Sequence, residues 1–448
     1  MLIELTLAKI AQICNGELIG EDQPVLNIIS DTRSIQSGSL FVAFTGERFD
    51  GHDYAVQALE QGAVAVLSEQ TLPLKSYIKV ADTRRAYGQI ARAVRDAFTG
   101  PVVCITGSNG KTSVKDWLAQ SLNHHNVLKT QANLNNQIGV PQTLLGLQAG
   151  QDVAVVETGT SVPGEIERLA SIACPDVVIL TNASGSHFEG FGDLRGIAIE
   201  KGQLISGAKR TAKVILNADD GFYDYWCGLT QGREVLSFGF TDRADLYAED
   251  IQLGDQSSQV TLSYLGQSVR VEVGSPGKHQ IANGMAVVLA MLAVGEDFHF
   301  AVSQLSKPAF VAGRLERLCT KNEALLINDC YNASPASVKA AIDVLSMQKV
   351  SKTWLILGAL GELGDQQESI HHELGEYAYQ QGIDHLICVG DIAAIAGRAF
   401  TQGNAKALFC QSHEEAAQLV QTLDKNHAIL VKGSRSAKME NVIKALIN

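Results

Sequence analysis

The sequence predicts an α/β protein whose 448 residues form three domains. Continuous apolar runs such as "VVCIT" (102–106) and "DVVIL" (176–180) are typical of parallel strands that are covered on both faces. Segments with helical periodicity, such as "KTSVKDWLAQSL" (111–122), separate these runs, and this alternation is the pattern of layered α/β domains. The chain is also too long for one core, because single cores stop growing at about 250–300 residues.

The N-terminal region has short elements of its own. "MLIELTLAKIAQICNG" (1–16) predicts a strand followed by an amphipathic helix; it lacks the basic start of a signal peptide. "SLFVAFTG" (39–46) and "GAVAVLSE" (62–69) read as further strands. We place the first domain at residues 1–82.

The middle of the chain contains two kinds of strand pattern, continuous apolar runs and alternating apolar and polar residues. "DVAVVE" (152–157) and "KVILN" (213–217) continue the series of buried strands, whereas residues 246–273 alternate around Leu265-Gly266 and predict an antiparallel hairpin. After "VAGRLE" (311–316) the strand and helix alternation starts again, for example in "TWLILGAL" (353–360). This restart predicts a second domain over 83–312 and a third over 313–448.

Composition narrows the classes of function. A net charge of −12 argues against a nucleic-acid surface, since such surfaces need clustered Lys and Arg. The longest apolar stretch, 285–294, is too short to cross a bilayer, so we expect no membrane insertion. Eight cysteines without a CxxC pair are typical of buried thiols in a reducing compartment. We therefore expect a cytoplasmic protein.

A glycine-rich loop, "ITGSNGKTS" (105–113), joins the strand at 102–106 to a predicted helix. Small residues let backbone N–H groups converge on an anion, and the helix N-terminus adds partial positive charge. Lys111 is placed to contact the β- and γ-phosphates of a nucleotide, and the Thr112 hydroxyl to bind Mg²⁺. The usual phosphate loop has glycine where Ile105 stands, so an ordinary strand–helix turn remains an alternative.

Polar residues follow two further buried strands. Glu157 ends a run of valines, and Asn182 and His187 follow the strand at 176–180. Carboxyl ends of parallel strands meet at one edge of a sheet, where ligands bind. Taken singly, such a Glu is as often a surface group, and a lone His is usually structural.

Together these motifs resemble the ATP-dependent Mur ligase family, which builds the peptide stem of the bacterial cell-wall precursor. The family's phosphate loop reads TGxxGKT/S, as at 106–112, which accounts for the missing glycine. The resemblance covers essentially the whole chain. It implies the three-domain Mur ligase architecture, with an N-terminal domain for the UDP end of the substrate, a central P-loop ATPase domain and a Rossmann-like C-terminal domain.

The resemblance also implies ligand contacts. It assigns ATP binding to Gly107, Ser108, Asn109, Gly110, Lys111, Thr112, Ser113, Asn283, Arg314, Asp329, Tyr331 and Asn332. It assigns two Mg²⁺ ions to Thr112, Glu157, His187 and Lys201, with Lys201 carried as a carbamate. Outside the family, Lys201 would read as a solvated helix lysine and Asn283 as an ordinary helix polar residue.

"SDTRS" (30–34) and "RFDGHDY" (48–54) resemble the family's contacts to the UDP end of the substrate, although the second stretch also reads as a plain turn. The expected UDP contacts are Ser30, Thr32, Arg33, Phe49, Asp50, Gly51 and His52. "NLNNQIGVP" (133–141) resembles the branch of the family that adds D-alanyl-D-alanine. This places Asn133, Asn135, Asn136, Thr160 and Ser161 near the peptide and its reacting acyl group.

The implied reaction is ATP-dependent ligation of D-alanyl-D-alanine to UDP-N-acetylmuramoyl-tripeptide through an acyl phosphate, by a monomer. Its expected catalytic residues are Lys111, Lys201, His187, Asn135 and Asn136. A branch that adds diaminopimelate or lysine is the nearest alternative, but the DNPR motif of its diaminopimelate-specific members is absent. Folylpolyglutamate synthase fits the loop but not the N-terminal domain, and an ATP-gated binding protein is the non-enzyme alternative. Ala359 departs from the common "LGDMGELG" form, in which an acidic residue occupies that position.

Overall fold

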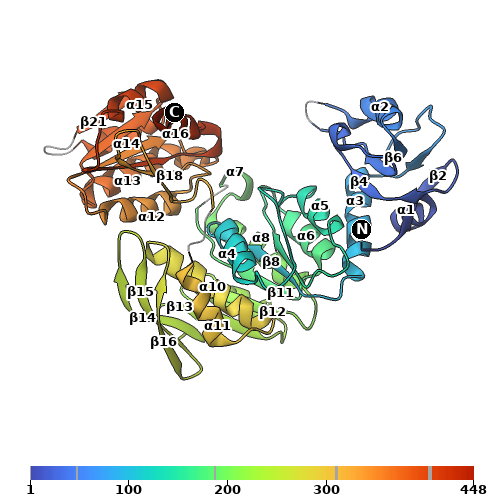
Figure 1. The fold of residues 1–448 in the computed structure, drawn as a ribbon, viewed down its shortest axis with the longest axis horizontal. Helices are drawn as coiled ribbons and strands as arrows, with labels where there is room; N and C mark the ends of the chain where they lie inside the picture. Colours follow the sequence, from blue (N-terminus) through green and yellow to red (C-terminus); the bar gives the residue numbers. More distant parts are fainter. Residues whose placement is uncertain (1, 47–48, 186–187, 308–310, 402–405, 448) are drawn as a thin grey trace.

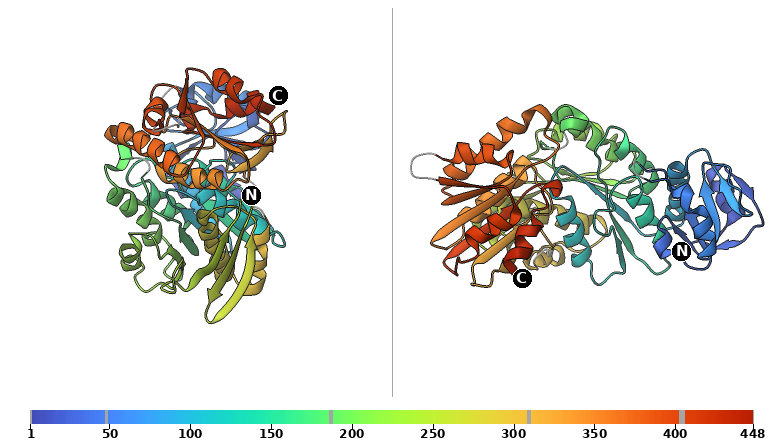
Figure 2. Two further views of the ribbon diagram at one scale, coloured as in Figure 1. Left: turned by 90° about the vertical axis from the view of Figure 1, so that its left-hand side faces the viewer. Right: turned by 90° about the horizontal axis from the view of Figure 1, so that it is seen from above.

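The computed structural model of the chain describes residues 2–46, 49–185, 188–307, 311–401 and 406–447. Three sheet-containing parts follow one another, with the N-terminal part at one end and the C-terminal part at the other (Figures 1 and 2). The predicted α/β class with three such parts is confirmed. In the described residues no helix has the length and apolar character needed to span a membrane.

The N-terminal sheet has the strand order β2-β7-β6-β5-β4. Its strands are β2 (Glu17–Ile19), β4 (Asn27–Ile29), β5 (Ser39–Val42), β6 (Ala63–Ser68) and β7 (Tyr77–Lys79), of which the last four run parallel. The predicted start is confirmed: β1 (Leu5–Thr6) leads into α1 (Leu7–Cys14), and β1 pairs with β3 (Pro24–Val25). The helix α2 (Ala55–Glu60) packs against β6.

One long helix joins the first two parts. The side chain of Asp82 caps the N-terminus of α3 (Thr83–Asp96) by accepting a hydrogen bond from the Arg85 backbone N–H. This helix packs on α1 and also on α5 (Gly139–Leu145) and α6 (Glu165–Ala173) of the central part. The boundary near residue 82 stays a prediction, and it falls at the start of this shared helix.

The central sheet has the order β16-β15-β14-β13-β12-β11-β8-β10-β9. Its parallel strands are β8 (Val102–Thr106), β9 (Val127–Lys129), β10 (Val153–Glu157), β11 (Val177–Leu180), β12 (Lys213–Asn217), β13 (Val235–Gly239) and β14 (Leu246–Leu253). The predicted hairpin is confirmed as β15 (Ser258–Tyr264) and β16 (Gln267–Val273), antiparallel and joined at Leu265 and Gly266, whose φ angles are 48° and 78°. It extends the same sheet as a long yellow-green ribbon (Figure 1).

Helices cover both faces of the parallel strands. The helices α4 (Lys111–Ser121) and α10 (Lys278–Ala293) pack on one face, where Trp117 and Met285 share a core with Ile105. The opposite face carries α3, α5, α6 and α8 (Leu194–Ser206). Strands β10 and β11 lie on either side of β8, so the connections diverge at the carboxyl end of β8, where doubly wound sheets bind ligands. The remaining short helices are α7 (Phe188–Phe191), α9 (Tyr223–Gly228) and α11 (Phe298–Ser303).

The C-terminal sheet has the order β17-β18-β22-β19-β20-β21, parallel except for the edge strand β17. Its strands are β17 (Glu316–Cys319), β18 (Leu325–Asp329), β19 (Lys352–Gly358), β20 (His385–Val389), β21 (Lys406–Cys410) and β22 (His427–Lys432). Its helices are α12 (Pro335–Ser346), α13 (Gln367–Gln380), α14 (Ala393–Phe400), α15 (His413–Val420) and α16 (Glu440–Ile447). Separate cores on the two faces of the sheet give the Rossmann-like arrangement that was predicted.

Candidate active site

The glycine-rich loop of residues 107–110 depends on two glycines. Gly107 has φ 151° and Gly110 has φ 86°, which L-residues with side chains rarely adopt. A Cβ on Gly107 would lie 1.9 Å from Thr181 Oγ1, and one on Gly110 would lie 2.4 Å from Asn283 Oδ1. The loop therefore approaches both β11 and α10 too closely for any other residue.

Hydrogen bonds to the end of β11 hold the loop in place. The Ser108 N–H donates to the Asn182 carbonyl at 2.9 Å, and the Asn109 N–H donates to Asn182 Oδ1 at 3.0 Å. The Thr181 hydroxyl donates to the Asn109 carbonyl at 2.6 Å. Asn182, expected from the sequence to lie near the phosphates, thus acts on the loop itself.

Lys111, the first residue of α4, lies folded over this loop. Its Nζ donates to the Gly107 carbonyl at 2.7 Å and to the Ser108 carbonyl at 3.3 Å. Burial lowers the pKa of Lys111, while the negative charge of Glu157 counteracts this shift and the positive charge of Arg314 adds to it. An ammonium held at a glycine-rich loop is suited to contact phosphate oxygens.

Glu157 ends β10 in a buried position beside the loop. Its Oε1 accepts a hydrogen bond from Asn135 Nδ2 at 2.8 Å, and its Oε2 is buried without a hydrogen-bond partner. The Nζ of Lys115, a buried lysine that sequence reasoning did not select, lies 3.8 Å from Oε2. Because buried carboxylate oxygens are normally paired, Oε2 suits an additional cation such as Mg²⁺.

Lys201 lies on α8 and is also buried. Burial moves its pKa well below the ordinary value, and the nearby charge of Lys111 adds to the shift, whereas Glu200 opposes it. Glu200, not selected from the sequence, accepts hydrogen bonds from the backbone N–H groups of Gly164 and Ile166, each at 2.8 Å. Its carboxylate therefore holds the start of α6, and Lys201 is left in surroundings that favour a neutral amine.

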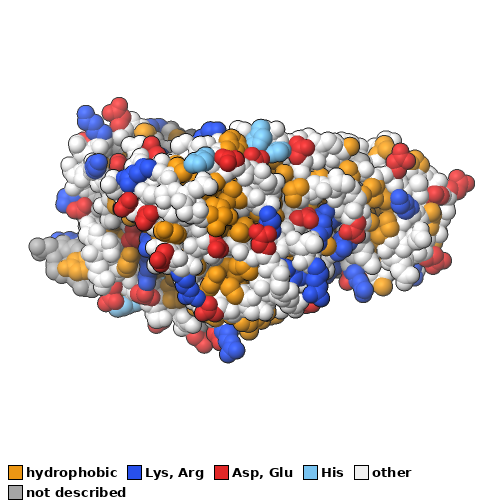
Figure 3. Space-filling model, turned by 90° about the horizontal axis from the view of Figure 1, so that it is seen from below, with side chains coloured by type: hydrophobic (Ala, Val, Ile, Leu, Met, Phe, Trp, Pro, Cys, Tyr) orange, Lys and Arg blue, Asp and Glu red, His pale blue; other side chains and the backbone are white. Residues whose placement is uncertain are grey.

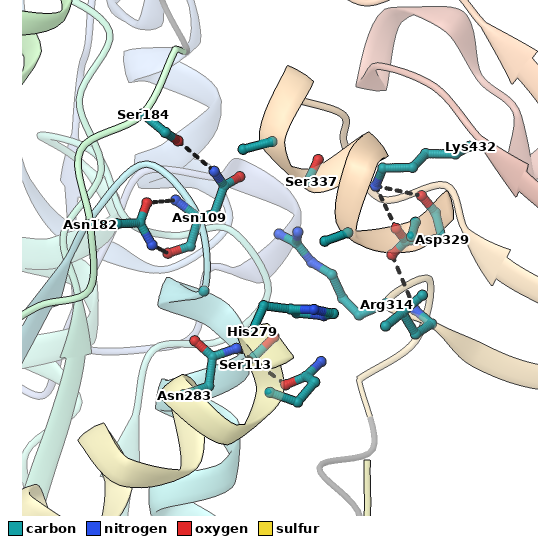
Figure 4. A pocket seen from close by; sticks show the side chains of 16 residues that line it. Asn109, Ser113, Asn182, Ser184, His279, Asn283, Arg314, Asp329, Ser337 and Lys432 are labelled. Atoms are coloured by element: carbon teal, nitrogen blue, oxygen red, sulfur yellow. Dashed lines mark hydrogen bonds and ion pairs between the residues drawn. The ribbon is translucent and has the colours of Figure 1, made fainter. Parts of the chain in front are cut away.

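A cavity of about 270 Å³ opens between the loop and the C-terminal part (Figure 4). Asn109, Ser113, Asn182, His279 and Asn283 line it from the central part, and Arg314, Asp329, Ser337 and Lys432 from the C-terminal part. Arg314 stacks over the ring of Tyr331, 4.4 Å from the ring centroid, and its Nε is buried without a hydrogen-bond partner. In Figure 4 this side chain extends toward Asn109 and His279.

Three further residues were not selected from the sequence: Lys432 and His279 line this cavity, and Ser334 contacts Asn109, which lines it. Lys432 Nζ forms an ion pair with Asp329 Oδ2 at 2.5 Å and donates to the Asn332 carbonyl at 3.1 Å. The Ser334 hydroxyl donates to Asn109 Oδ1 at 2.7 Å and so joins the C-terminal part directly to the loop. Burial lowers the pKa of His279 to about 4. His279 lies in the stretch "GKHQIANG" (277–284) and Lys432 in "VKGSRSAKME" (431–440), and only the fold brings the two residues to the site.

The predicted UDP contacts gather at the carboxyl edge of the N-terminal sheet, after β4 and β5. Asp50 caps the 3₁₀ turn Gly51–Tyr54 and accepts hydrogen bonds from the His52 backbone N–H at 3.0 Å and from His52 Nδ1 at 2.5 Å. Gly51 fits because a Cβ there would lie 2.8 Å from the Phe44 backbone. Phe49 is 62% exposed, and Arg33 is exposed and paired with Asp31. Ser30 is exposed and Thr32 half-buried at the same edge.

The predicted asparagine cluster divides into different roles. Asn135 contacts Glu157, whereas Asn136 Oδ1 caps the start of α5 by accepting from the N–H groups of Ile138 and Gly139 at 3.1 and 2.9 Å. The Asn133 side chain is exposed. The Thr160 hydroxyl donates to the Val162 carbonyl at 2.9 Å, and the Ser161 N–H donates to Glu165. His187, the fourth predicted metal ligand, lies outside the described residues.

Several known proteins are similar to this chain in sequence and in structure. The sequence pattern of the Mur ligase middle domain matches residues 105–291, that of the Mur ligase glutamate ligase domain matches 313–435, and that of the Mur ligase family catalytic domain matches 25–95. A UDP-N-acetylmuramoyl-tripeptide–D-alanyl-D-alanine ligase of Escherichia coli K12 is 37% identical over 99% of both chains.

Two solved structures resemble the chain throughout. A MurF crystal structure from Acinetobacter baumannii has a TM-score of 0.92 and 31% identity, covering 99% of both chains. A MurF ligase from Thermotoga maritima, solved in complex with ADP, has a TM-score of 0.84 and 28% identity, covering 94% of this chain and 96% of that one. The chain therefore belongs to the Mur ligase family and groups with its MurF members.

Proposed function

We propose that this chain uses ATP to join D-alanyl-D-alanine to UDP-N-acetylmuramoyl-tripeptide, which yields the pentapeptide precursor of peptidoglycan. The observation that carries the proposal is a full-length relative of that activity, 37% identical, combined with a cavity that faces a phosphate loop. The absence of a DNPR motif speaks against the branch that adds diaminopimelate. An ATP-gated binding protein would leave the buried Glu157 and Lys201 without a joint purpose.

The chemistry begins with the terminal carboxylate of the tripeptide. One carboxylate oxygen attacks the γ-phosphorus of ATP, and the bond to the bridging oxygen breaks, which gives an acyl phosphate and ADP. The dipeptide amine then attacks the acyl carbon, and inorganic phosphate leaves from a tetrahedral intermediate. Phosphoryl transfer requires mainly positioning and charge neutralisation. Arg314 lines the cavity, and Lys111 lies on the adjoining glycine-rich loop, close enough for the charge of Arg314 to lower its pKa; the two are placed to supply both.

Three described residues, Thr112, Glu157 and Lys201, fit the two expected Mg²⁺ ions. Thr112 and Glu157 Oε2, which has no hydrogen-bond partner and lies 3.8 Å from Lys115 Nζ, would hold one ion. A carbamate on Lys201 would hold the other together with His187, which lies outside the described residues. Magnesium would neutralise the charge that develops on the phosphates. A neutral amine is the form that adds to CO₂, and the burial of Lys201 favours that form.

The ends of the substrate are assigned by position. The exposed Phe49 ring and Arg33 guanidinium suit the base and diphosphate of UDP, together with Ser30, Thr32 and the Asp50–His52 turn. Asn133 and Asn135 lie on the loop after β9, Thr160 and Ser161 lie on the loop after β10, and Asn135 contacts Glu157. We assign these residues to the peptide end of the substrate. With the proposed boundaries near residues 82 and 312, the UDP contacts lie in the first domain and the peptide contacts in the second.

Phosphate release by the purified full chain tests the proposal. The assay contains ATP, Mg²⁺ and UDP-N-acetylmuramoyl-tripeptide, with D-alanyl-D-alanine, diaminopimelate, lysine, D-glutamate or L-alanine as the amine. We expect release only with the dipeptide, and a pentapeptide product by mass spectrometry. Turnover with a single amino acid on a shorter precursor would overturn the assigned branch. Release that no amine stimulates would overturn ligation.

A further inference from the structure

A second cluster of chemically active side chains lies away from the nucleotide cavity. Within the part of the chain that the structure describes, His124, His125 and Glu296 bring three potential ligand atoms within 4.8 Å of one another. The Nε2 atoms of His124 and His125 lie 3.0 and 2.8 Å from the same oxygen, Glu296 Oε1. The two rings lie with their centroids 4.2 Å apart, so both imidazoles converge on one point. On the face seen from below, histidine side chains lie beside acidic ones (Figure 3).

This cluster lies at the far ends of the two helices that form the nucleotide site. Helix α4 begins at Lys111 in the loop and ends at Ser121, just before His124. Helix α10 begins at Lys278 beside the cavity and ends at Ala293, just before Glu296. With a rise of 1.5 Å per residue, the 16 residues of α10 span about 24 Å. The cluster is therefore separate from any magnesium bound at Glu157.

The cluster stands on an ordered backbone. The His125 N–H donates to the Leu122 carbonyl at 2.9 Å, and the Glu296 N–H donates to the Met291 carbonyl at 3.0 Å, so helix-terminal turns fix both residues. The second ring nitrogen of His125, Nδ1, lies 3.8 Å from Asp152 Oδ2. That oxygen is itself held by the Asn126 N–H at 2.8 Å. A carboxylate behind a histidine is the usual support for a metal-binding imidazole.

We propose that His124, His125 and Glu296 bind a divalent transition metal of the Zn²⁺ class. Two imidazoles and one carboxylate are a ligand set that Zn²⁺ uses, with a fourth position left for water. Mg²⁺ prefers oxygen ligands alone, so it is a poor occupant. On binding, each Nε2 gives up its hydrogen bond to Glu296 and turns its lone pair to the metal, and the ring proton is then carried on Nδ1. At His125 this nitrogen lies 3.8 Å from Asp152 Oδ2.

Access and charge suit such an ion. The side chains of His124, His125 and Glu296 are 42%, 32% and 16% exposed, so a hydrated ion can enter from solvent. Glu296 supplies a carboxylate oxygen that both histidine Nε2 atoms already approach. Bound metal would tie the end of α4 to the end of α10. It would thereby brace the two helices that shape the nucleotide site.

Zinc titration of the purified, chelator-treated full chain tests the proposal, with Zn²⁺ alone followed by calorimetry. We expect one site that is lost or weakened at least tenfold in His124→Ala and in His125→Ala, and a Zn²⁺-dependent rise in melting temperature that both variants lose. His299→Ala is the matched control. His299 is an exposed histidine on α11, three residues after Glu296, and it is not a member of the cluster. This control should bind Zn²⁺ as the wild type does.

A second variant separates the cluster from the nucleotide site. Glu157→Gln should keep the zinc site, because Glu157 lies on β10 at the opposite edge of the sheet. With Cu²⁺ in place of Zn²⁺, nitrogen couplings in the electron paramagnetic resonance spectrum should report two imidazoles and lose one in each histidine variant. Equal zinc affinity in the wild type and in the His124→Ala, His125→Ala double variant would overturn the proposal. So would a site that disappears in Glu157→Gln.

Discussion

Two glycine-containing connections stand at the carboxyl edges of parallel sheets, and they are built differently. The glycine-rich loop (107–110) bonds to β11 and, through Asn109, to Ser334, which is 225 residues away. In the Asp50–His52 turn, Asp50 accepts hydrogen bonds from both the N–H and the ring nitrogen of His52, and the other bonds of the turn stay within the N-terminal part, for example from the Glu69 N–H to His52 Nε2 at 3.3 Å. The loop is therefore joined to another part of the chain, whereas the turn is held within the N-terminal part.

This difference predicts where function and stability separate. Changes at the loop should affect nucleotide chemistry and respond to the position of the C-terminal part. Changes at the turn should cost folding free energy and leave the nucleotide step intact. The following substitutions test that contrast, from the largest expected effect to the smallest.

Lys111→Ala should reduce the rate of phosphate release on the order of 10²–10³-fold, because it removes a charge that stabilises the transferring phosphoryl group. The measurement is kcat with saturating substrates, alongside circular dichroism to show an intact fold. Lys209→Ala is the control, since Lys209 pairs with Asp176 at the opposite edge of the same sheet. Near-normal turnover in Lys111→Ala would break the contrast at its strongest point.

Lys201→Ala should lower the ligation rate about 10–100-fold, as expected when a group that supports a metal is removed. Acetate or formate should restore part of the rate by replacing the carbamate, and the same salts should not accelerate Lys209→Ala. Full ligation by Lys201→Ala without added carboxylate would contradict the carbamate assignment.

We expect His279 to make the folding stability of the chain fall in acid. Its pKa of about 4 lies below the ordinary 6.5, so the unfolded chain takes up the proton first. Stability is therefore complete above pH 6.5 and falls as the pH drops from 6.5 to 4, by about 1–3 kcal/mol.

Urea unfolding at pH 7 and pH 4.5 measures this loss. His279→Gln should remove it, while the exposed control His299→Gln should keep it. Identical acid sensitivity in the wild type and His279→Gln would show that another group is responsible.

Asp50→Ala should cost about 1 kcal/mol of unfolding free energy, since it removes the cap of the turn. The KM for ATP should not change, and the KM for the UDP substrate should rise. Asp53→Ala, an exposed neighbour in the same turn, serves as control. A higher KM for ATP in Asp50→Ala would show that the turn also affects nucleotide binding.

Ser334→Ala should raise the KM for ATP about fivefold, which corresponds to one hydrogen bond of about 1 kcal/mol. Ser334 also caps α12, so the matched control is Ser412→Ala, which removes the cap of α15 away from the cavity. Equal KM values in the two variants would mean that the bond to Asn109 contributes nothing to nucleotide binding.

Local patterns in the sequence predicted the parts of the fold that depend on local chemistry. The valine run placed Glu157 at a strand end, and the alternation around Leu265-Gly266 predicted the hairpin. The glycine pattern located the loop, because close packing against Thr181 and Asn283 leaves room for nothing larger.

The remaining site residues depend on contacts that no local pattern contains. Lys115 resembles an ordinary helix lysine until the fold buries it 3.8 Å from Glu157. Lys432 meets Asp329 across 103 residues of chain. Asn136 stays a predicted contact of the acyl group, and the cap that its side chain gives to Ile138 and Gly139 was not predicted. Such pairings are decided by strand order and helix packing.

The cavity is lined by residues of both the central and the C-terminal part, and this affects how the chain unfolds. A molecule that fills it touches Asn283 on one side and Lys432 on the other, and so becomes a shared part of two folding units. Ligand binding stabilises only the state in which both walls are present. Bound nucleotide should therefore make the central and C-terminal parts unfold together, in one cooperative thermal transition.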